Sequence, residues 1–265
     1  MSNIKETAKK YLQSGLSVVF LQANKKSNLS GWKDLERQAL TPEEIDNLYA
    51  GNSIRTDIVK EGKTKDGKPY TIRGFNFYPE KDPSYLGIIA GKVSGGLEVV
   101  DVDCKYDLTG SLWDELKTLL QDNLGDTFNS LVIAQTKSGG YHIYYRCEEI
   151  EGNLKLANRP TTEKEREATY QEKISAGKTE DVSKRASQND KTRVLIETRG
   201  EGGYVVAPPS EGYKFIQGEE WGIPRITPQE RACILAIARD FNQVKEIPTP
   251  AKKTATGQEL SLIHI

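Results

Sequence analysis

Apolar residues along the chain follow two patterns, compact runs typical of buried strands and repeats at three- to four-residue spacing typical of helices. Apolar runs predict strands at residues 17–21, 86–90, 97–102, 131–135, 141–145 and 193–197. Helical spacing predicts a first helix from Ile4 that ends near Gly15. Three further helices are predicted by patterns typical of capping boxes, which begin at Thr41, Ser111 and Thr227. The chain contains no internal repeat.

Three stretches depart from these patterns. Residues 58–72 are polar, and Asp66-Gly67 at their centre predicts a hairpin on the surface. Residues 155–191 are dense in charges of both signs and lack strand alternation, so they predict a peripheral helix with mobile flanks. Beyond Pro248 the chain is rich in proline, lysine and threonine, which is typical of a linker or tail.

Composition limits the classes of function. The chain has 265 residues, of which 28% are charged and 36% hydrophobic, with a formal net charge of −1. Any surface for nucleic acid must therefore be a local patch. The cysteines, Cys104, Cys147 and Cys233, are too scattered for a disulfide framework or a zinc site. No signal peptide or membrane-spanning run is present, so we expect a cytoplasmic protein without a membrane partner.

The stretch Leu97–Asp103 places two acids at the end of an otherwise apolar strand. Alternate strand residues share a face about 6.6 Å apart, so Asp101 and Asp103 are expected on one side and Val100 and Val102 on the other. Two carboxylates on one face repel unless cations lie between them, and hard divalent ions take oxygen ligands. The pair therefore indicates a metal site for phosphoryl or nucleotidyl transfer. The alternative is a strand that runs into a solvated acidic turn.

His142 interrupts another apolar strand and follows the glycine-rich turn Ser138-Gly139-Gly140. Backbone N–H groups of such a turn can approach phosphate oxygens, and Lys137 adds a mobile positive charge. Together these residues indicate a cradle for a triphosphate, with His142 donating to a phosphate. The alternatives are a histidine of the core and an ordinary hairpin turn.

Glu197 ends its strand as the acids at 101 and 103 do, and it can complete the ligand set for two metal ions. Two-metal polymerases hold their ions about 4 Å apart, where one activates the attacking 3′-hydroxyl and the other neutralises the leaving pyrophosphate. The alternative for Glu197 is a surface ion pair with Arg193 or Arg199, which contributes little energy.

With these residues in this order, the sequence resembles the bifunctional primase-polymerase (prim-pol) domain of the archaeo-eukaryotic primase superfamily, found in plasmids, phages and other mobile elements. The motifs that carry the resemblance are, in order, Lys26 with Gly31-Trp32-Lys33, the strand at 86–91, Val99–Asp103, Ser138–Tyr145 and Ile196–Ser210.

The resemblance implies an α+β fold in which an antiparallel sheet like that of an RNA-recognition motif, with flanking helices, packs against an N-terminal α/β module. Residues 1–245 would form the prim-pol catalytic domain, followed by a linker or tail at 246–265. Within that domain the expected parts are the N-terminal module at 1–95, the catalytic core at 96–210 with a charged insertion at about 155–191, and a helix region at 211–245.

The resemblance also implies roles for individual residues. The expected catalytic residues are Asp101, Asp103, His142 and Glu197, of which the three acids would hold two Mg²⁺ or Mn²⁺ ions. The expected nucleotide-binding residues are Lys137, Ser138, Gly139, Gly140, His142 and Arg199.

Two departures from the family pattern are visible. Family members often carry aspartate where this chain has Glu197, and often a Ser-x-His motif where it has Gly140-Tyr141-His142, so a serine contact would have to come from Ser138. The chain contains no zinc-binding insertion and no phosphate-binding loop of the Walker type. Priming is therefore expected to depend on template stacking or on a separate domain.

The function implied is a template-dependent DNA primase and polymerase of a mobile element, plasmid or phage, which transfers nucleotides from NTP or dNTP to a 3′-hydroxyl. Its expected partners are a single-stranded DNA template, a primer and a helicase domain or protein. Local charge also predicts template contacts by Lys155, Arg159, Lys184, Arg185, Lys191 and Arg193, the alternative being a solvated surface.

Two other functions stay open. One is a non-catalytic replication-initiation module that binds single-stranded nucleic acid through Tyr141, Tyr144 or Tyr204 as stacking platforms. The other, less favoured, is a glycosyltransferase whose D-x-D pair holds a metal on a nucleotide sugar.

Overall fold

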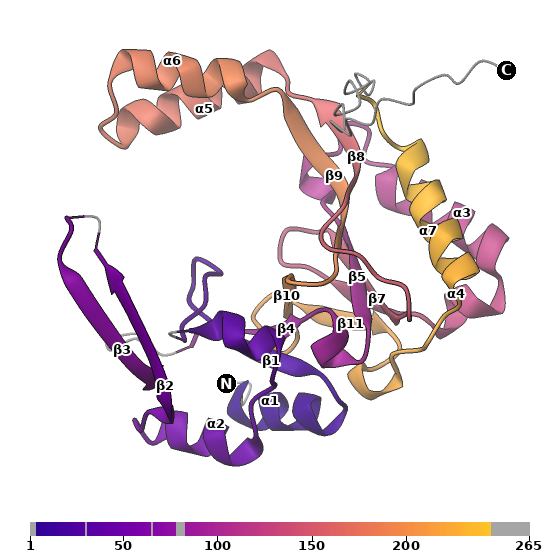
Figure 1. The fold of residues 1–265 in the computed structure, drawn as a ribbon. Coiled ribbons are helices and arrows are strands. Elements are labelled where there is room, and N and C mark those ends of the chain that lie inside the picture. Colours follow the sequence, from indigo (N-terminus) through magenta and orange to yellow (C-terminus); the bar gives the residue numbers. More distant parts are fainter. Residues whose placement is uncertain (1–3, 30, 65, 78–82, 245–265) are drawn as a thin grey trace, which may run out of the picture.

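The structure is a computed structural model that describes residues 4–29, 31–64, 66–77 and 83–244. Two antiparallel sheets form its body (Figure 1). The smaller has three strands in the order β1 (Ser17–Leu21), β4 (Tyr85–Ile89) and β10 (Tyr204–Ala207). Its outer strands thus come from the start of the chain and from the stretch after the last predicted acid.

The larger sheet has six strands, all antiparallel to their neighbours. Their order is β11 (Lys214–Gln217), β6 (Val132–Gln135), β7 (Tyr141–Arg146), β5 (Leu97–Val102), β9 (Thr192–Arg199) and β8 (Lys155–Pro160). The four strands β6-β7-β5-β9, with a helix between β5 and β6, follow the split βαβ order of ferredoxin-like sheets. The expected α+β fold with a central antiparallel sheet is confirmed.

Helices cover one face of the six-stranded sheet (Figure 1). They are α3 (Leu112–Leu124), α4 (Asp126–Ser130) and α7 (Pro228–Asp240). Val100 and Val102 of β5 point into this layer and pack with Leu116 and Ile234 in one buried cluster. Because strand residues alternate, β5 contributes every second side chain to this core.

The opposite face of β5 packs against the three-stranded sheet, together with α1 (Ile4–Gln13) and α2 (Pro42–Tyr49). Val99 and Tyr144 belong to this second buried cluster. Alternation puts Asp101 on the same face as Val99, just beyond the apolar contact. The acids therefore lie where the smaller sheet stops covering the larger one.

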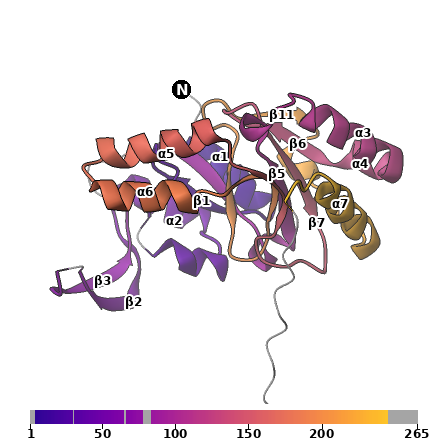
Figure 2. The ribbon, with the colours of Figure 1, turned by 90° about the horizontal axis from the view of Figure 1, so that it is seen from above.

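Two arms extend from the body to the same side (Figure 1 and Figure 2). One is the helical pair α5 (Glu163–Ser175) and α6 (Glu180–Asn189), and the other is the hairpin β2 (Ile54–Lys63) with β3 (Pro69–Phe75). The hairpin predicted around Asp66-Gly67 is confirmed. Short 3₁₀ helices lie in the connections: η1 (Trp32–Glu36), η2 (Lys92–Ser94), η3 (Cys104–Tyr106) and η4 (Glu220–Gly222).

The peripheral helix predicted within 155–191 is present as a pair of helices, but the expectation that this segment contains no strand is wrong. Residues 155–160 form strand β8, and two helices follow it. Register shifts in the β8–β9 pairing interrupt the alternation, so that Leu156 and Ala157 are both buried although they are neighbours. A bulged strand gives no period-two signal in the sequence.

The capping box predicted at Ser111 is also wrong, although a helix does begin there. The Ser111 side chain makes no capping hydrogen bond. Instead the Asp107 carboxylate accepts hydrogen bonds from the backbone N–H groups of Leu112 and Thr109, both at 2.9 Å. At Thr41 and Thr227 the predicted capping boxes are formed.

Within the described residues, no helix combines the length and the apolar character needed to cross a membrane. The predicted division into an N-terminal module at 1–95 and a catalytic core at 96–210 stays a prediction. Strand β10, from the predicted core, pairs with β4 of the predicted N-terminal module in the smaller sheet. The predicted tail at 246–265 lies outside the described residues.

A buried ion pair attaches α7 to the central strand. The Glu98 carboxylate is fully buried, and Arg231 donates to it from Nε at 2.6 Å and from Nη2 at 2.9 Å. The Tyr145 hydroxyl donates to the same carboxylate at 2.7 Å. A buried carboxylate of this kind is tolerated only while its partners are present.

Arg231→Leu should therefore lower the free energy of unfolding by roughly 3–5 kcal/mol, because it leaves Glu98 buried without its cation. Urea unfolding measures the change, and Arg239→Leu, at an exposed position on the same helix, is the matched control. A loss below about 1 kcal/mol would show that Glu98 is satisfied without Arg231.

Candidate active site

The strand register brings three of the predicted residues into one row. Asp101 of β5 is paired with His142 of β7 on one side and with Glu197 of β9 on the other. Directly paired residues point to the same face of a sheet, about 5 Å apart. The three side chains therefore meet at the centre of the sheet although they are far apart in the sequence.

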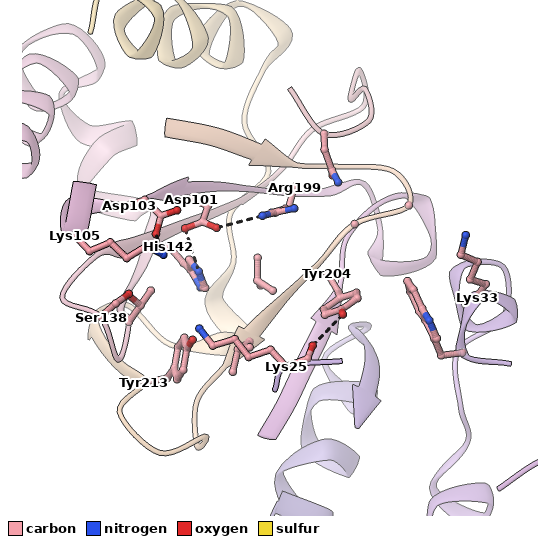
Figure 3. A pocket seen from close by; sticks show the side chains of 17 residues that line it. Lys25, Lys33, Asp101, Asp103, Lys105, Ser138, His142, Arg199, Tyr204 and Tyr213 are labelled. Carbon is pink, nitrogen blue, oxygen red and sulfur yellow. Dashed lines mark hydrogen bonds and ion pairs between the residues drawn. The ribbon is translucent and has the colours of Figure 1, made fainter. Parts of the chain in front are cut away.

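Asp101 is the central residue of this row, and Figure 3 shows it between His142 and Arg199. One carboxylate oxygen lies 3.5 Å from His142 Nε2, and the other lies 3.8 Å from Arg199 Nη2. Burial alone would raise the pKa of Asp101, but the contact with His142 and the charges of Arg199 and Lys105 lower it below its ordinary value. Asp101 is thus an ionised carboxylate held among cations.

His142 is buried and held from both sides. Its Nδ1 lies 3.2 Å from the Tyr144 hydroxyl, while Nε2 faces Asp101. Burial raises the pKa of Tyr144 well above its ordinary value, so the hydroxyl stays protonated. The Tyr213 ring lies beside the imidazole with 6.0 Å between centroids. These contacts fix the ring orientation of His142 at the wall of the site.

The two other acids also have cationic neighbours. Asp103 lies just past the end of β5, and its carboxylate is 3.0 Å from Lys105 Nζ. Glu197 accepts a hydrogen bond from Arg199 Nη2. Burial raises the pKa of Glu197, and the charges of Asp101 and Asp103 add to this against the charge of Arg199. The ion pair expected as the alternative for Glu197 therefore exists, but inside a cluster of three acids.

The glycine-rich turn is built differently from a phosphate cradle at two of its positions. The N–H of Gly139 donates to the Thr136 carbonyl at 3.0 Å, and the N–H of Gly140 donates to the Thr136 hydroxyl at 3.1 Å. A Cβ at Gly140 would lie 2.2 Å from the Val102 carbonyl oxygen, so only glycine fits beside β5. The backbone N–H groups of Gly139 and Gly140 are therefore already hydrogen-bonded within the turn and do not point to a ligand.

Lys137 is directed to a neighbouring part of the surface. Its Nζ lies 3.3 Å from the Tyr85 hydroxyl and 3.2 Å from the Glu211 carboxylate. Ser138, the next residue, does line the site. Of the two, the structure places only the serine beside the acids.

A pocket of about 530 Å³ opens in front of the row (Figure 3). That volume is within the range of roughly 300–1,000 Å³ typical of small-molecule sites. The predicted residues at its wall are Asp101, Asp103, Ser138, His142 and Arg199, whereas Glu197, Lys137, Gly139 and Gly140 do not line it. Further lining residues include Lys25, Trp32, Lys33, Lys105, Asn153, Tyr204 and Tyr213.

Sequence reasoning gave no site role to several of these residues. Lys105 could have been found, because it follows the acid pair by two positions and pairs with Asp103. Asn153 accepts a hydrogen bond from the Gly200 N–H at 3.2 Å, a contact between distant loops. Lys25 and Tyr213 also lie outside the residues to which roles were assigned. Only the folded chain brings these side chains to the acids.

The donor chemistry fits hard divalent ions, because Asp101, Asp103 and Glu197 supply carboxylate oxygens. In the described part of the chain, however, no group of three or more His, Cys, Asp or Glu side chains has the spacing of a metal site. Each acid instead faces a basic group of the protein. Ions at this position would have to replace those contacts.

In metal-free buffer, ionisation of Asp101 and ionisation of Glu197 should have opposite effects on the free energy of unfolding. The pKa of folded Asp101 is lowered, so its ionisation stabilises the fold, and this contribution is lost as pH falls through the folded pKa. The pKa of folded Glu197 is raised, so its ionisation costs stability as pH rises from the unfolded value through the folded one. At pH 7 in EDTA, Asp101→Asn should lower the thermal midpoint and Glu197→Gln should raise it.

Differential scanning fluorimetry between pH 3 and 8 measures both effects, with Glu115→Gln at an exposed helix position as the control. The effect of Glu197→Gln should disappear below its unfolded pKa of about 4.3. Changes of the same sign at pH 7 would contradict the opposite environments assigned to the two acids.

Comparison with known families assigns the chain. The sequence model described as "Bifunctional DNA primase/polymerase, N-terminal" (Prim-Pol) matches residues 8–230, which include the acid row and both sheets. No curated protein matches the chain. The match extends over most of the chain and confirms the resemblance and the primase-like core. The chain therefore belongs to the prim-pol family of bifunctional DNA primase/polymerase N-terminal domains.

Proposed function

We propose that this chain is a template-dependent DNA primase and polymerase that transfers nucleotides from NTP or dNTP to a 3′-hydroxyl, in the replication of a mobile element, plasmid or phage. Family membership supports a primase/polymerase-type function in general. The observation that carries the specific proposal is the row of Glu197, Asp101 and His142 across neighbouring strands, beside a pocket of nucleotide size.

In this proposal Asp101, Asp103 and Glu197 hold two Mg²⁺ or Mn²⁺ ions. Such ions, when bound, neutralise the triphosphate and lower the pKa of the attacking 3′-hydroxyl. His142 presents its Nε2 to a phosphate oxygen, with its ring orientation held by the Tyr144 hydroxyl. Its Nε2 lies 3.5 Å from Asp101, which is long for a hydrogen bond, so a phosphate oxygen could replace this contact once cations neutralise Asp101.

Arg199 and Ser138 are the proposed nucleotide contacts best placed at the pocket wall. Arg199 already spans two of the acids, and a guanidinium pairs with phosphate as readily as with carboxylate. For Lys137, Gly139 and Gly140 the role in nucleotide binding stays a prediction that requires their present partners to be exchanged.

Template contacts were predicted for six basic residues between positions 155 and 193, and this prediction is wrong for Arg159. Arg159 is 2% exposed and is bound to the Glu165 carboxylate at 2.8 and 2.6 Å, so it is not available for DNA. Arg193 and Lys184 are paired with Asp190 and Glu180. The exposed residues for which no ion pair is described are Lys155, Arg185 and Lys191, although Lys155 lies opposite Glu197 in the β8–β9 register, and these three remain the proposed template contacts.

The non-catalytic binding module has less support. Tyr144 is fully buried and cannot stack on a base, while Tyr141 is already stacked on Trp113 with 3.8 Å between centroids. Tyr204 lines the pocket but packs edge-on against Trp32. No observation on the described residues favours the glycosyltransferase.

Primer extension tests the proposal. With single-stranded DNA template, labelled nucleotides and Mg²⁺ or Mn²⁺, the purified chain should form products, and Asp101→Asn or Asp103→Asn should reduce their rate by at least about a hundredfold. Asp114→Asn, at an exposed position of α3, is the matched control and should leave the rate unchanged.

The assay is run with and without an annealed primer. Products in both cases identify a primase and polymerase, and products only with primer identify a polymerase that needs a partner to start. Absence of products from the unmodified chain in both cases would overturn the catalytic proposal in favour of the binding module.

A further inference from the structure

The cations at the pocket wall fall into two groups. Lys105 and Arg199 are engaged with the acids, Lys105 with Asp103 and Arg199 with Glu197. Lys25 and Lys33 also line the pocket, but in the described part of the chain neither has an acidic partner. The second group therefore supplies positive charge that no acid among the described residues neutralises.

Lys25 is held in place by its backbone. It occupies a left-handed conformation with φ of 63°, in a turn where its N–H donates to the Gln22 carbonyl at 2.8 Å. The Tyr204 hydroxyl donates to the Lys25 carbonyl at 3.0 Å, and the Tyr204 ring packs against Trp32. A non-glycine residue in this conformation persists only where its surroundings enforce it.

The Lys25 side chain crosses the pocket toward the catalytic sheet (Figure 3). Its Nζ lies 5.7 Å from the centroid of the Tyr213 ring, and this ring in turn lies 6.0 Å from the His142 ring. The ammonium thus reaches the side of the pocket where His142 and Ser138 lie. The side chain is exposed, so its ammonium group is accessible to an anion in the pocket.

Lys137 does not supply a cation at this place. It was predicted to do so from its position before the glycine-rich turn, but its Nζ is bound to Tyr85 and Glu211. Lys25, which comes from the turn after β1, instead extends into the pocket toward Tyr213 (Figure 3).

We propose that Lys25 binds the triphosphate of the incoming nucleotide beyond its α-phosphate, so that the N-terminal part of the chain supplies part of the nucleotide site. The inference rests on the proposed function, because the α-phosphate is then located at the acids. Lysine is a common phosphate ligand that acts as a compact charge, and its contribution grows with the charge of the ligand.

Nucleotide binding to Lys25→Gln tests this role, because glutamine keeps the length of the side chain and removes its charge. Titration calorimetry with Mg²⁺ compares dATP, dAMP and inorganic tripolyphosphate as ligands of the full chain. We expect dATP and tripolyphosphate to bind roughly tenfold to a hundredfold more weakly to this variant, with dAMP changed less than about threefold. Lys25→Arg should recover most of the affinity.

Lys26→Gln is the matched control, since Lys26 is exposed in the same turn but does not line the pocket. Its affinities should equal those of the unmodified chain, and circular dichroism verifies that each variant is folded. Equal dATP affinity of Lys25→Gln and the unmodified chain would overturn the role of Lys25 and leave the proposed function intact. Failure of the unmodified chain to bind dATP would overturn both.

Discussion

The cost of placing three carboxylates together in a half-buried site is the constraint on which this structure depends. Asp101 and Glu197 are paired at the centre of a sheet and Asp103 lies just past the end of strand β5, where like charges repel and burial disfavours ionisation. The chain offsets this cost with a basic group beside each acid, and these are His142, Lys105 and Arg199. In the proposed function, divalent ions and a triphosphate would replace these contacts.

The position of this cluster follows from the burial of strand β5 on both faces. One face is covered along its length by α3, α4 and α7, and the other only as far as Val99 by the three-stranded sheet. The pocket opens where that cover ends. The chain crosses between the sheets from β4 to β5 and from β9 to β10, so residues of both sheets, such as Asp101 and Tyr204, line the same cavity.

Local signals predicted much of the fold and less of the site. The central strands and two of three capping boxes follow from residues close in sequence, and so does the position of Val100 and Val102 on the face opposite Asp101. The pairing of Asp101 with His142 and Glu197 depends on long-range register, which one sequence does not specify. Strand β8 was missed because bulges hide its alternation. The proposed role of Lys25 could not be predicted, because Lys25 lies on a loop far from Asp101 in the sequence and only the fold brings both residues to the same pocket.

The most direct test of the account is a crystal structure with Mn²⁺ and a non-hydrolysable dNTP, in which anomalous scattering locates the ions. The account predicts Mn²⁺ peaks bound by Asp101, Asp103 and Glu197, with the Arg199 guanidinium moved from Glu197 toward phosphate. An intact Arg199–Glu197 pair, with no Mn²⁺ at the three acids, would contradict it.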